Sequence, residues 1–131
     1  MDLVRRVTAF AAACVAATSA VAADFDGSKR LICATIEARD CVSGEECFKG
    51  LPDDVGAPAF VRIDFERKAM VGPQRTTPIL FMEKNERQVL LQGTELGYAW
   101  AFVLDQTNGK FSASLTDYDG AFVLFGACTP L

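Results

Sequence analysis

Cysteines are the residues with the most specific chemistry in this chain, which contains five of them in 131 residues. Four of them follow residue 23, at Cys33, Cys41, Cys47 and Cys128. A metal site or a thiol redox centre requires closely spaced Cys-x-x-Cys pairs, and none occurs here. The sequence also contains no histidine, the commonest metal ligand. These four thiols are therefore expected to form two disulfide bonds.

Three pairings of four cysteines are possible, and we favour Cys41 with Cys47 and Cys33 with Cys128. Gly44 lets the short loop CVSGEEC close on itself. Cys33 lies in the first predicted strand, and Cys128 ends the last. A chain-entropy model assigns about 2 kcal/mol to the small ring and about 5 kcal/mol to the large one. The long bridge would therefore matter most for stability, and the short one would clip a loop shut.

Carboxylates are the other groups that could perform chemistry, and they occur in three close pairs: Glu45 with Glu46, Asp53 with Asp54, and Asp117 with Asp119. A glycosidase needs two facing carboxylates, and calcium needs about six to eight oxygen ligands. Each pair lies in a turn-like or loop-like segment, where acidic residues are expected for solvation. The sequence also lacks a G-x-S-x-G elbow and a phosphate-binding glycine loop. We therefore expect no enzymatic activity, no cofactor and no metal site.

The charge balance limits the classes of partner. The chain has 17 acidic and 13 basic residues, a formal net charge of −4. It contains no basic patch or lysine run, so nucleic acid and anionic membrane surfaces are poor partners. An acidic surface favours a cationic partner, although so small a net charge is also typical of ordinary solubility.

Residues 1–23 predict a secretory signal peptide. Two arginines precede an uncharged run that ends at Ala23, and small residues near its end suit cleavage. The run is short and weakly apolar for crossing about 30 Å of hydrocarbon, and lipidation at Cys14 would leave an even shorter apolar segment. We therefore expect export to the periplasm or secretion, no membrane contact after cleavage, and one mature domain of residues 24–131.

The mature chain predicts an all-β fold. Residues 59–66, AFVRIDFE, alternate apolar and polar side chains, which indicates a half-buried strand. Seven other segments, rich in aromatic and β-branched residues, are also predicted to be strands: 30–38, 69–71, 78–83, 88–93, 98–104, 111–116 and 121–127. Asn108-Gly109 and Asp119-Gly120 suit hairpin turns. We expect an antiparallel meander of about eight short strands, closed as a small barrel or folded as a sandwich.

One segment, residues 39–58, interrupts this pattern with three glycines and two prolines. Asp53 is a candidate cap for one turn of helix within it. Long structured loops are often functional, but disulfides also replace missing core in small exported domains. We favour a disulfide-stapled loop that covers one end of the barrel.

Aromatic residues gather in the second half of the chain. Trp100, Phe102 and Leu104 share one face of their predicted strand, and the last strand is apolar on both faces. The extra apolar face predicts either a ligand cavity or an exposed contact site. A barrel of about eight strands holds only its own side chains or one small ligand, so size favours filling by side chains.

The segments DFDGSKRLICATIEA, GYAWAFVLDQTNGKFSAS and FGACTP resemble small, uncharacterised exported proteins of Gram-negative bacteria. This resemblance implies a periplasmic location and carries no activity with it. In size, acidity, disulfides and β content, the chain is more loosely similar to periplasmic lysozyme inhibitors. It departs from them because it lacks their Ser-Gly-x-x-Tyr inhibitory loop, and a shared fold does not imply a shared function.

Together these features favour an exported, non-enzymatic binding module, expected to be a monomer, whose partner is an unidentified protein or a small apolar ligand. Its candidate binding residues are Glu45, Glu46, Phe48, Lys49, Tyr98 and Trp100. The loop charges would steer a partner, and the rings would supply contact area. The alternative is a periplasmic inhibitor of a cationic hydrolase such as lysozyme, with the acidic loop in a basic cleft. An enzyme that uses a carboxylate pair ranks below both.

Overall fold

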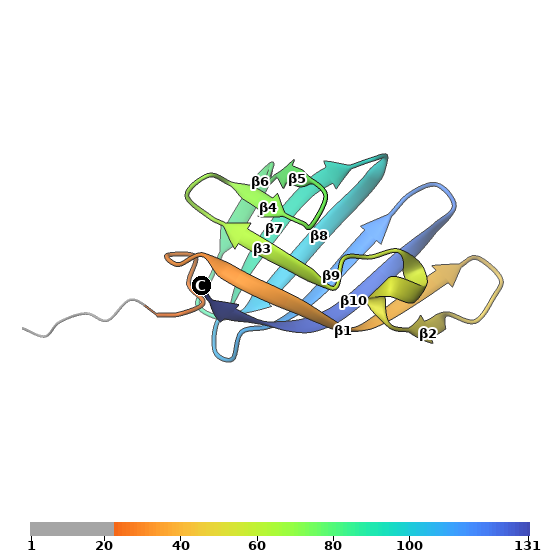
Figure 1. Ribbon diagram of the computed structural model, residues 1–131, viewed down its shortest axis with the longest axis horizontal. Helices are drawn as coiled ribbons and strands as arrows, with labels where there is room; N and C mark the ends of the chain where they lie inside the picture. Colours follow the sequence, from red (N-terminus) through yellow and green to blue (C-terminus); the bar gives the residue numbers. More distant parts are fainter. Residues whose placement is uncertain (1–22) are drawn as a thin grey trace, which may run out of the picture.

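A computed structural model describes residues 23–131, so the predicted signal peptide lies outside the described residues except for Ala23. Within them, ten strands form one antiparallel sheet that curves into a half-barrel (Figure 1). The elements are β1 (Leu31–Val42), β2 (Phe48–Gly50), the 3₁₀ helix η1 (Pro52–Val55), β3 (Phe60–Asp64), β4 (Ala69–Val71), β5 (Thr76–Pro78), β6 (Phe81–Lys84), β7 (Gln88–Glu95), β8 (Tyr98–Asp105), β9 (Lys110–Thr116) and β10 (Gly120–Pro130). The predicted all-β fold is confirmed.

The order of the strands explains the curvature. It runs β5-β4-β3-β1-β10-β9-β8-β7-β6, and β2 adds to β1 off this path. The two edge strands, β5 and β6, follow each other directly in the chain. The Leu80 N–H donates to the Gln92 carbonyl at 2.9 Å, and the Thr77 hydroxyl donates to the Thr94 carbonyl at 2.9 Å. The segment from β5 to β6 therefore draws the β4 side of the sheet towards β7.

Apolar side chains on the inner face of the sheet form the core. In β3 and the residues after it, Ile63 and Phe65 are buried whereas Arg62 and Glu66 are exposed, so the predicted alternation is confirmed. The other large buried residues come from both halves of the sheet: Leu31, Met70, Ile79, Val89, Leu91, Trp100, Phe102, Leu104, Phe111 and Leu124.

Two glycines make room for aromatic rings inside the half-barrel. Gly93 lies opposite Trp100 in the β7–β8 pair, and Gly126 lies opposite Phe111 in the β10–β9 pair. A Cβ atom on Gly93 would overlap the indole ring, and one on Gly126 would overlap both the Phe111 ring and a backbone carbonyl of β1. Phe111 in turn stacks on Phe102, with ring centroids 4.5 Å apart. Large side chains thus occupy the inner face.

Both favoured disulfides are present in the structure. Cys33 and Cys128 face each other across the β1–β10 pair and are buried. Cys41 and Cys47 join the end of β1 to the residue before β2, at the surface. One bridge therefore links the two ends of the domain inside the core, and the other closes a hairpin.

The segment 39–58 is more regular than predicted. β1 continues to Val42 because it pairs with β10 along its whole length, with a bulge between Thr35 and Glu37. β2 then returns beside β1 and leads into η1. At the start of η1 the Leu51 N–H donates to the Asp54 carboxylate at 2.8 Å, so Asp54 rather than Asp53 makes the capping bond. The predicted loop is a hairpin followed by one helical turn.

The N-terminal segment closes one end of the half-barrel. The Phe25 side chain packs against the core and lies over Gly109, in the turn between β8 and β9. The Lys84 ammonium donates to the Asp26 carbonyl at 3.0 Å. Across residues 23–131, no helix is long and apolar enough to cross a membrane.

Candidate functional site

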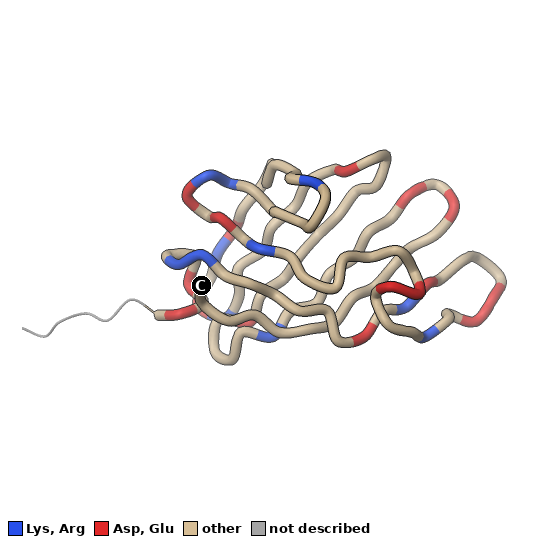
Figure 2. Tube along the Cα trace, in the orientation of Figure 1, with Lys and Arg blue, Asp and Glu red and all other residues tan. Residues whose placement is uncertain are grey.

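Acidic residues gather at the end of the half-barrel opposite the N-terminal segment, where the turns 43–46, 96–97 and 117–119 lie (Figure 2). We call this region, together with η1 and the adjoining strand ends, the acidic end. Its carboxylates are Glu37, Asp40, Glu45, Glu46, Asp53, Asp54, Glu95, Asp117 and Asp119, and its basic residues are Arg39, Lys49 and Arg75. The excess of negative charge in residues 23–131 is therefore concentrated at this end.

The register of the sheet places two rows of side chains on the inner face of the acidic end. The rim row contains Val42, Gly120, Asp117, Tyr98 and Glu95, and the row below it contains Asp40, Phe122, Leu115, Trp100 and Gly93. Asp40, Asp117 and Tyr98 are half-buried. Carboxylates from three separate strands or turns thus converge on the inner face.

Tyr98 is the polar aromatic residue of this rim. Its ring lies 5.9 Å from that of Phe122, at an interplanar angle of 48°. Partial burial raises the pKa of Tyr98, and the carboxylates of Asp117, Asp40 and Asp119 raise it further. The same negative field that disfavours the tyrosinate favours a cation beside the rings.

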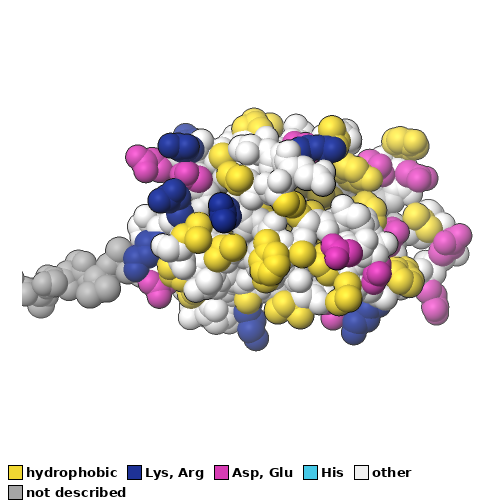
Figure 3. All heavy atoms as spheres, viewed as in Figure 1, with side chains coloured by type: hydrophobic (Ala, Val, Ile, Leu, Met, Phe, Trp, Pro, Cys, Tyr) yellow, Lys and Arg dark blue, Asp and Glu magenta, His cyan; other side chains and the backbone are white. Residues whose placement is uncertain are grey.

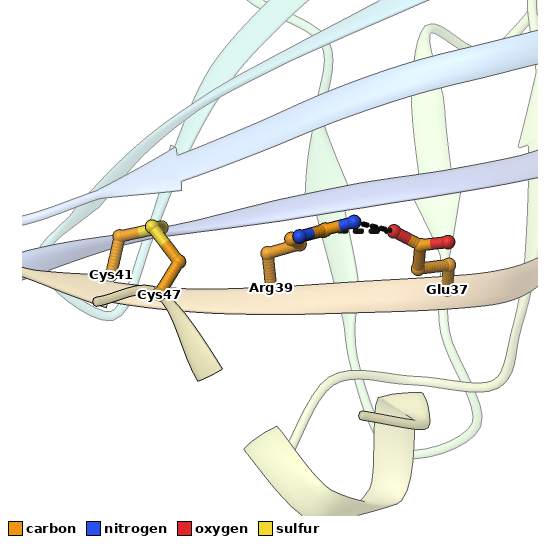
Figure 4. Close-up of a disulfide and its surroundings, with 4 residues drawn as sticks. All are labelled: Glu37, Arg39, Cys41 and Cys47. Atoms are coloured by element: carbon orange, nitrogen blue, oxygen red, sulfur yellow. Dashed lines mark hydrogen bonds and ion pairs between the residues drawn. A yellow bond between two sulfur atoms is a disulfide. The ribbon is translucent and has the colours of Figure 1, made fainter. Parts of the chain in front are cut away.

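Two basic side chains of the acidic end are paired with the same carboxylate. Arg39 donates to Glu37 at 2.8 Å on the outer face of β1, next to the Cys41–Cys47 disulfide (Figure 4). The Lys49 ammonium lies 3.5 Å from the same carboxylate. The pKa of Glu37 is lowered by the hydrogen bond from Arg39 and, to a lesser degree, by the charge of Lys49. Arg39 and Lys49 therefore both form ion pairs with Glu37.

Most of the other carboxylates have no such partner. Arg75 lies 3.9 Å from Glu95. In the part of the chain that the structure describes, no ion pair involves the rest of the acidic end: Asp40, Glu45, Glu46, Asp53, Asp54, Asp117 or Asp119. No basic side chain of the described residues therefore neutralises these carboxylates.

Large apolar side chains are exposed among these carboxylates. Tyr118 is 100% exposed in the β9–β10 turn, Leu96 is 68% exposed in the β7–β8 turn, and Phe48 is 56% exposed on β2. Figure 3 shows hydrophobic and acidic side chains intermixed at this end, at the right of the view. Exposed side chains of this kind can supply the apolar part of an interaction surface.

Five of the six predicted binding residues belong to the acidic end. Glu45 and Glu46 lie in the turn of the β1–β2 hairpin, Phe48 and Lys49 lie on β2, and all four are exposed. Tyr98 lies on the rim, in the neighbouring part of the sheet. The backbone pairing of Phe48 with Asp40, and of Asp40 with Phe122, connects the two groups.

The prediction for Trp100 needs correction. We expected its ring to offer contact area, but it lies on the inner face and is only 8% exposed. The indole fills the space above Gly93, which explains why a large aromatic is tolerated in the middle of β8. Its Nε1 atom has no hydrogen-bond partner among residues 23–131. Trp100 is a core residue.

Sequence patterns missed Asp40 and Phe122 as site residues. Asp40 fell in the segment that we predicted to be a loop, so its orientation was not considered. If the apolar alternation of β1 is continued past the bulge, Asp40 shares a face with buried Ala38. This alternation was the one sequence signal that could have placed Asp40 on the inner face.

Two of the carboxylate pairs have structural roles. One oxygen of Asp117 accepts hydrogen bonds from the N–H groups of Asp119 at 2.9 Å and Gly120 at 3.0 Å, which shapes the β9–β10 turn. Asp54 caps η1. Among residues 23–131, no group of three or more cysteines and carboxylates is placed to hold a metal ion.

Comparison with known proteins adds no family: no family model, no curated protein and no solved structure matches the chain. The geometry and charge of the acidic end therefore carry the functional conclusion.

Proposed function

We propose that this chain is an exported binding module whose acidic end docks onto a cationic surface of a protein partner. The observation that carries the proposal is the set of unpaired carboxylates around the exposed side chains of Tyr118, Leu96 and Phe48. Electrostatic complementarity of this kind speeds association and selects the partner. The exposed rings supply the apolar contact that holds the complex.

Export is part of the proposal. Two disulfides are typical of proteins that fold in an oxidising compartment, and residues 1–23 have the pattern of a cleaved signal peptide. A periplasmic or secreted module meets its partners outside the cytoplasm. The binding itself requires no catalytic group.

A specific alternative is an inhibitor of a cationic hydrolase such as lysozyme. The feature that favours it is the β1–β2 hairpin, which projects from the sheet in Figure 1 and carries Glu45 and Glu46 at its turn. The Cys41–Cys47 bridge keeps this projection ordered. A preorganised acidic hairpin suits insertion into a basic cleft.

The test measures binding of the mature protein to cationic lysozyme at low salt, with a neutral protein of similar size as reference. Glu45→Gln with Glu46→Gln should weaken binding about tenfold, because two charges of the acidic end are lost. The matched control is Glu83→Gln with Glu86→Gln, the same charge change away from the acidic end. Raising the salt should weaken binding further.

The outcomes separate the two functions. Binding that depends on the acidic end and leaves lysozyme active supports the module, and binding that also blocks lysozyme supports the inhibitor. If lysozyme stays fully active at low salt, the inhibitor alternative is wrong. If lysozyme does not bind at low salt, or if both double variants bind it like the wild type, the acidic end is not a docking surface for a cationic protein.

A further inference from the structure

A concave feature lies on the outer face of the sheet, outside the acidic end. It is a groove of about 420 Å³ lined by Ile32, Phe60, Arg62, Val71, Gly72 and Pro73. The sheet register places Arg62 between Ile32 of β1 and Val71 of β4, so these three outward-facing side chains adjoin. The proposed function does not use this surface.

The walls of the groove are apolar and partly open to solvent. Phe60, the first residue of β3, is 59% exposed. The turn after β4 forms the opposite side, where the Gly72 N–H donates to the Arg75 carbonyl at 2.7 Å and Pro73 follows. Figure 3 looks onto this face and shows hydrophobic side chains gathered across β1 and β3. A large exposed ring beside a concave surface is a feature of ligand sites.

Arg62 is the charged residue of this lining, and its charge is not neutralised within the groove. Among residues 23–131, the Arg62 side chain makes no ion pair. The nearest acidic residue along β3, Asp64, lies 3.9 Å from Arg67 instead. A guanidinium presents a planar set of donors that matches a carboxylate with two parallel hydrogen bonds.

We propose that this groove binds a small amphipathic carboxylate, such as a medium-chain fatty acid. The apolar chain lies along Phe60, Ile32 and Val71, and the carboxylate pairs with Arg62. The volume of the groove falls within the range of about 300 to 1,000 Å³ that small-molecule sites occupy. Charge complementarity selects the head group, and the exposed apolar wall selects the chain.

The experiment measures laurate binding to the mature protein by calorimetry, below the concentration at which laurate forms micelles. Dodecyltrimethylammonium, which has a similar chain and a cationic head, serves as the matched ligand. Arg62→Gln should weaken laurate binding at least about tenfold through loss of the charge-assisted pair, and Phe60→Ser should weaken it by loss of apolar contact. Both sites are exposed, so both variants should retain the fold, which thermal unfolding checks.

Two control variants make the result specific to the groove. Arg67→Gln removes an exposed arginine just after β3, and Phe81→Ser removes an exposed phenylalanine on β6. The proposal expects both controls to bind laurate like the wild type. It is overturned if laurate does not bind, if dodecyltrimethylammonium binds as tightly, or if Arg62→Gln and Phe60→Ser leave the affinity unchanged.

Discussion

The Cα atoms of Cys33 and Cys128 lie 3.9 Å apart across the β1–β10 pair, although 95 residues separate them in the chain. The first and last strands are therefore neighbours at the centre of the sheet, with β3 on one side and β9 on the other. The bridge links the two strands of this central pair, and each of the two strands pairs with one half of the sheet.

We expect Cys33→Ala with Cys128→Ala to destabilise the domain more than Cys41→Ala with Cys47→Ala. The closed loops differ greatly in length, and the chain-entropy model assigns them about 5 and about 2 kcal/mol. Urea unfolding of both double variants measures the difference in the free energy of unfolding. Equal losses would show that the two bridges contribute equally, contrary to the dependence on loop length in the chain-entropy model.

Ile63→Ala should cost about 3 kcal/mol of stability, because this side chain is fully buried and its truncation leaves a cavity. Its neighbour Arg62 faces solvent, so Arg62→Ala should change stability by no more than about 0.5 kcal/mol. The two variants test which face of β3 lies inward. A larger loss for Arg62→Ala would contradict the register of this strand.

Gly93→Ala should destabilise the domain by about 2 kcal/mol, because the new methyl group would overlap the Trp100 ring. Trp100 is the only tryptophan of the chain, so its fluorescence reports directly on the repacking. We expect a shift of the emission maximum together with a lower unfolding midpoint. The exposed neighbour Thr94→Ala is the control, and an unchanged spectrum in Gly93→Ala would refute the close packing.

Tyr98 should titrate above its ordinary pKa of about 10. Because the folded state favours the neutral phenol, its contribution to stability is present below the unfolded pKa and is lost as the pH rises through the folded pKa. In a Tyr118→Phe background Tyr98 is the only tyrosine, so ultraviolet absorbance follows it alone. A midpoint at or below 10 would contradict the burial.

Asp40→Asn in the same background separates the causes of that shift. Removal of the Asp40 charge should lower the Tyr98 midpoint, but the midpoint should stay above the ordinary value because burial is the largest cause. An unchanged midpoint would mean that the Asp40 carboxylate does not act on the Tyr98 ring, and would contradict its place on the inner face of the acidic end.

Local sequence patterns predicted the strands where neighbouring residues decide the structure. The alternation around Ile63 and the aromatic face of β8 identified inward-facing residues, because a period of two describes one face of a strand wherever that strand lies. The even number of cysteines after residue 23 predicted the disulfides for a similar reason, since the redox compartment constrains composition. The turns at Asn108 and Asp119 also follow from short-range backbone preferences.

The same patterns were less useful where long-range pairing decides the structure. β1 extends through Asp40 to Val42 only because β10 supplies hydrogen-bond partners far along the chain. The burial of Trp100 likewise depends on Gly93, which belongs to another strand and leaves room for the indole ring.

The acidic end depends on tertiary structure in the same way. Its residues come from turns that are distant in sequence, and carboxylates in a turn look like ordinary solvated residues until the sheet places them side by side. Composition and periodicity were enough to predict an all-β, disulfide-bonded domain, because composition is a property of the whole chain and periodicity is a property of neighbouring residues. The meeting of Asp40, Asp117 and Tyr98 on the inner face of the acidic end required the register of β1, β8, β9 and β10, which arises from contacts between strands.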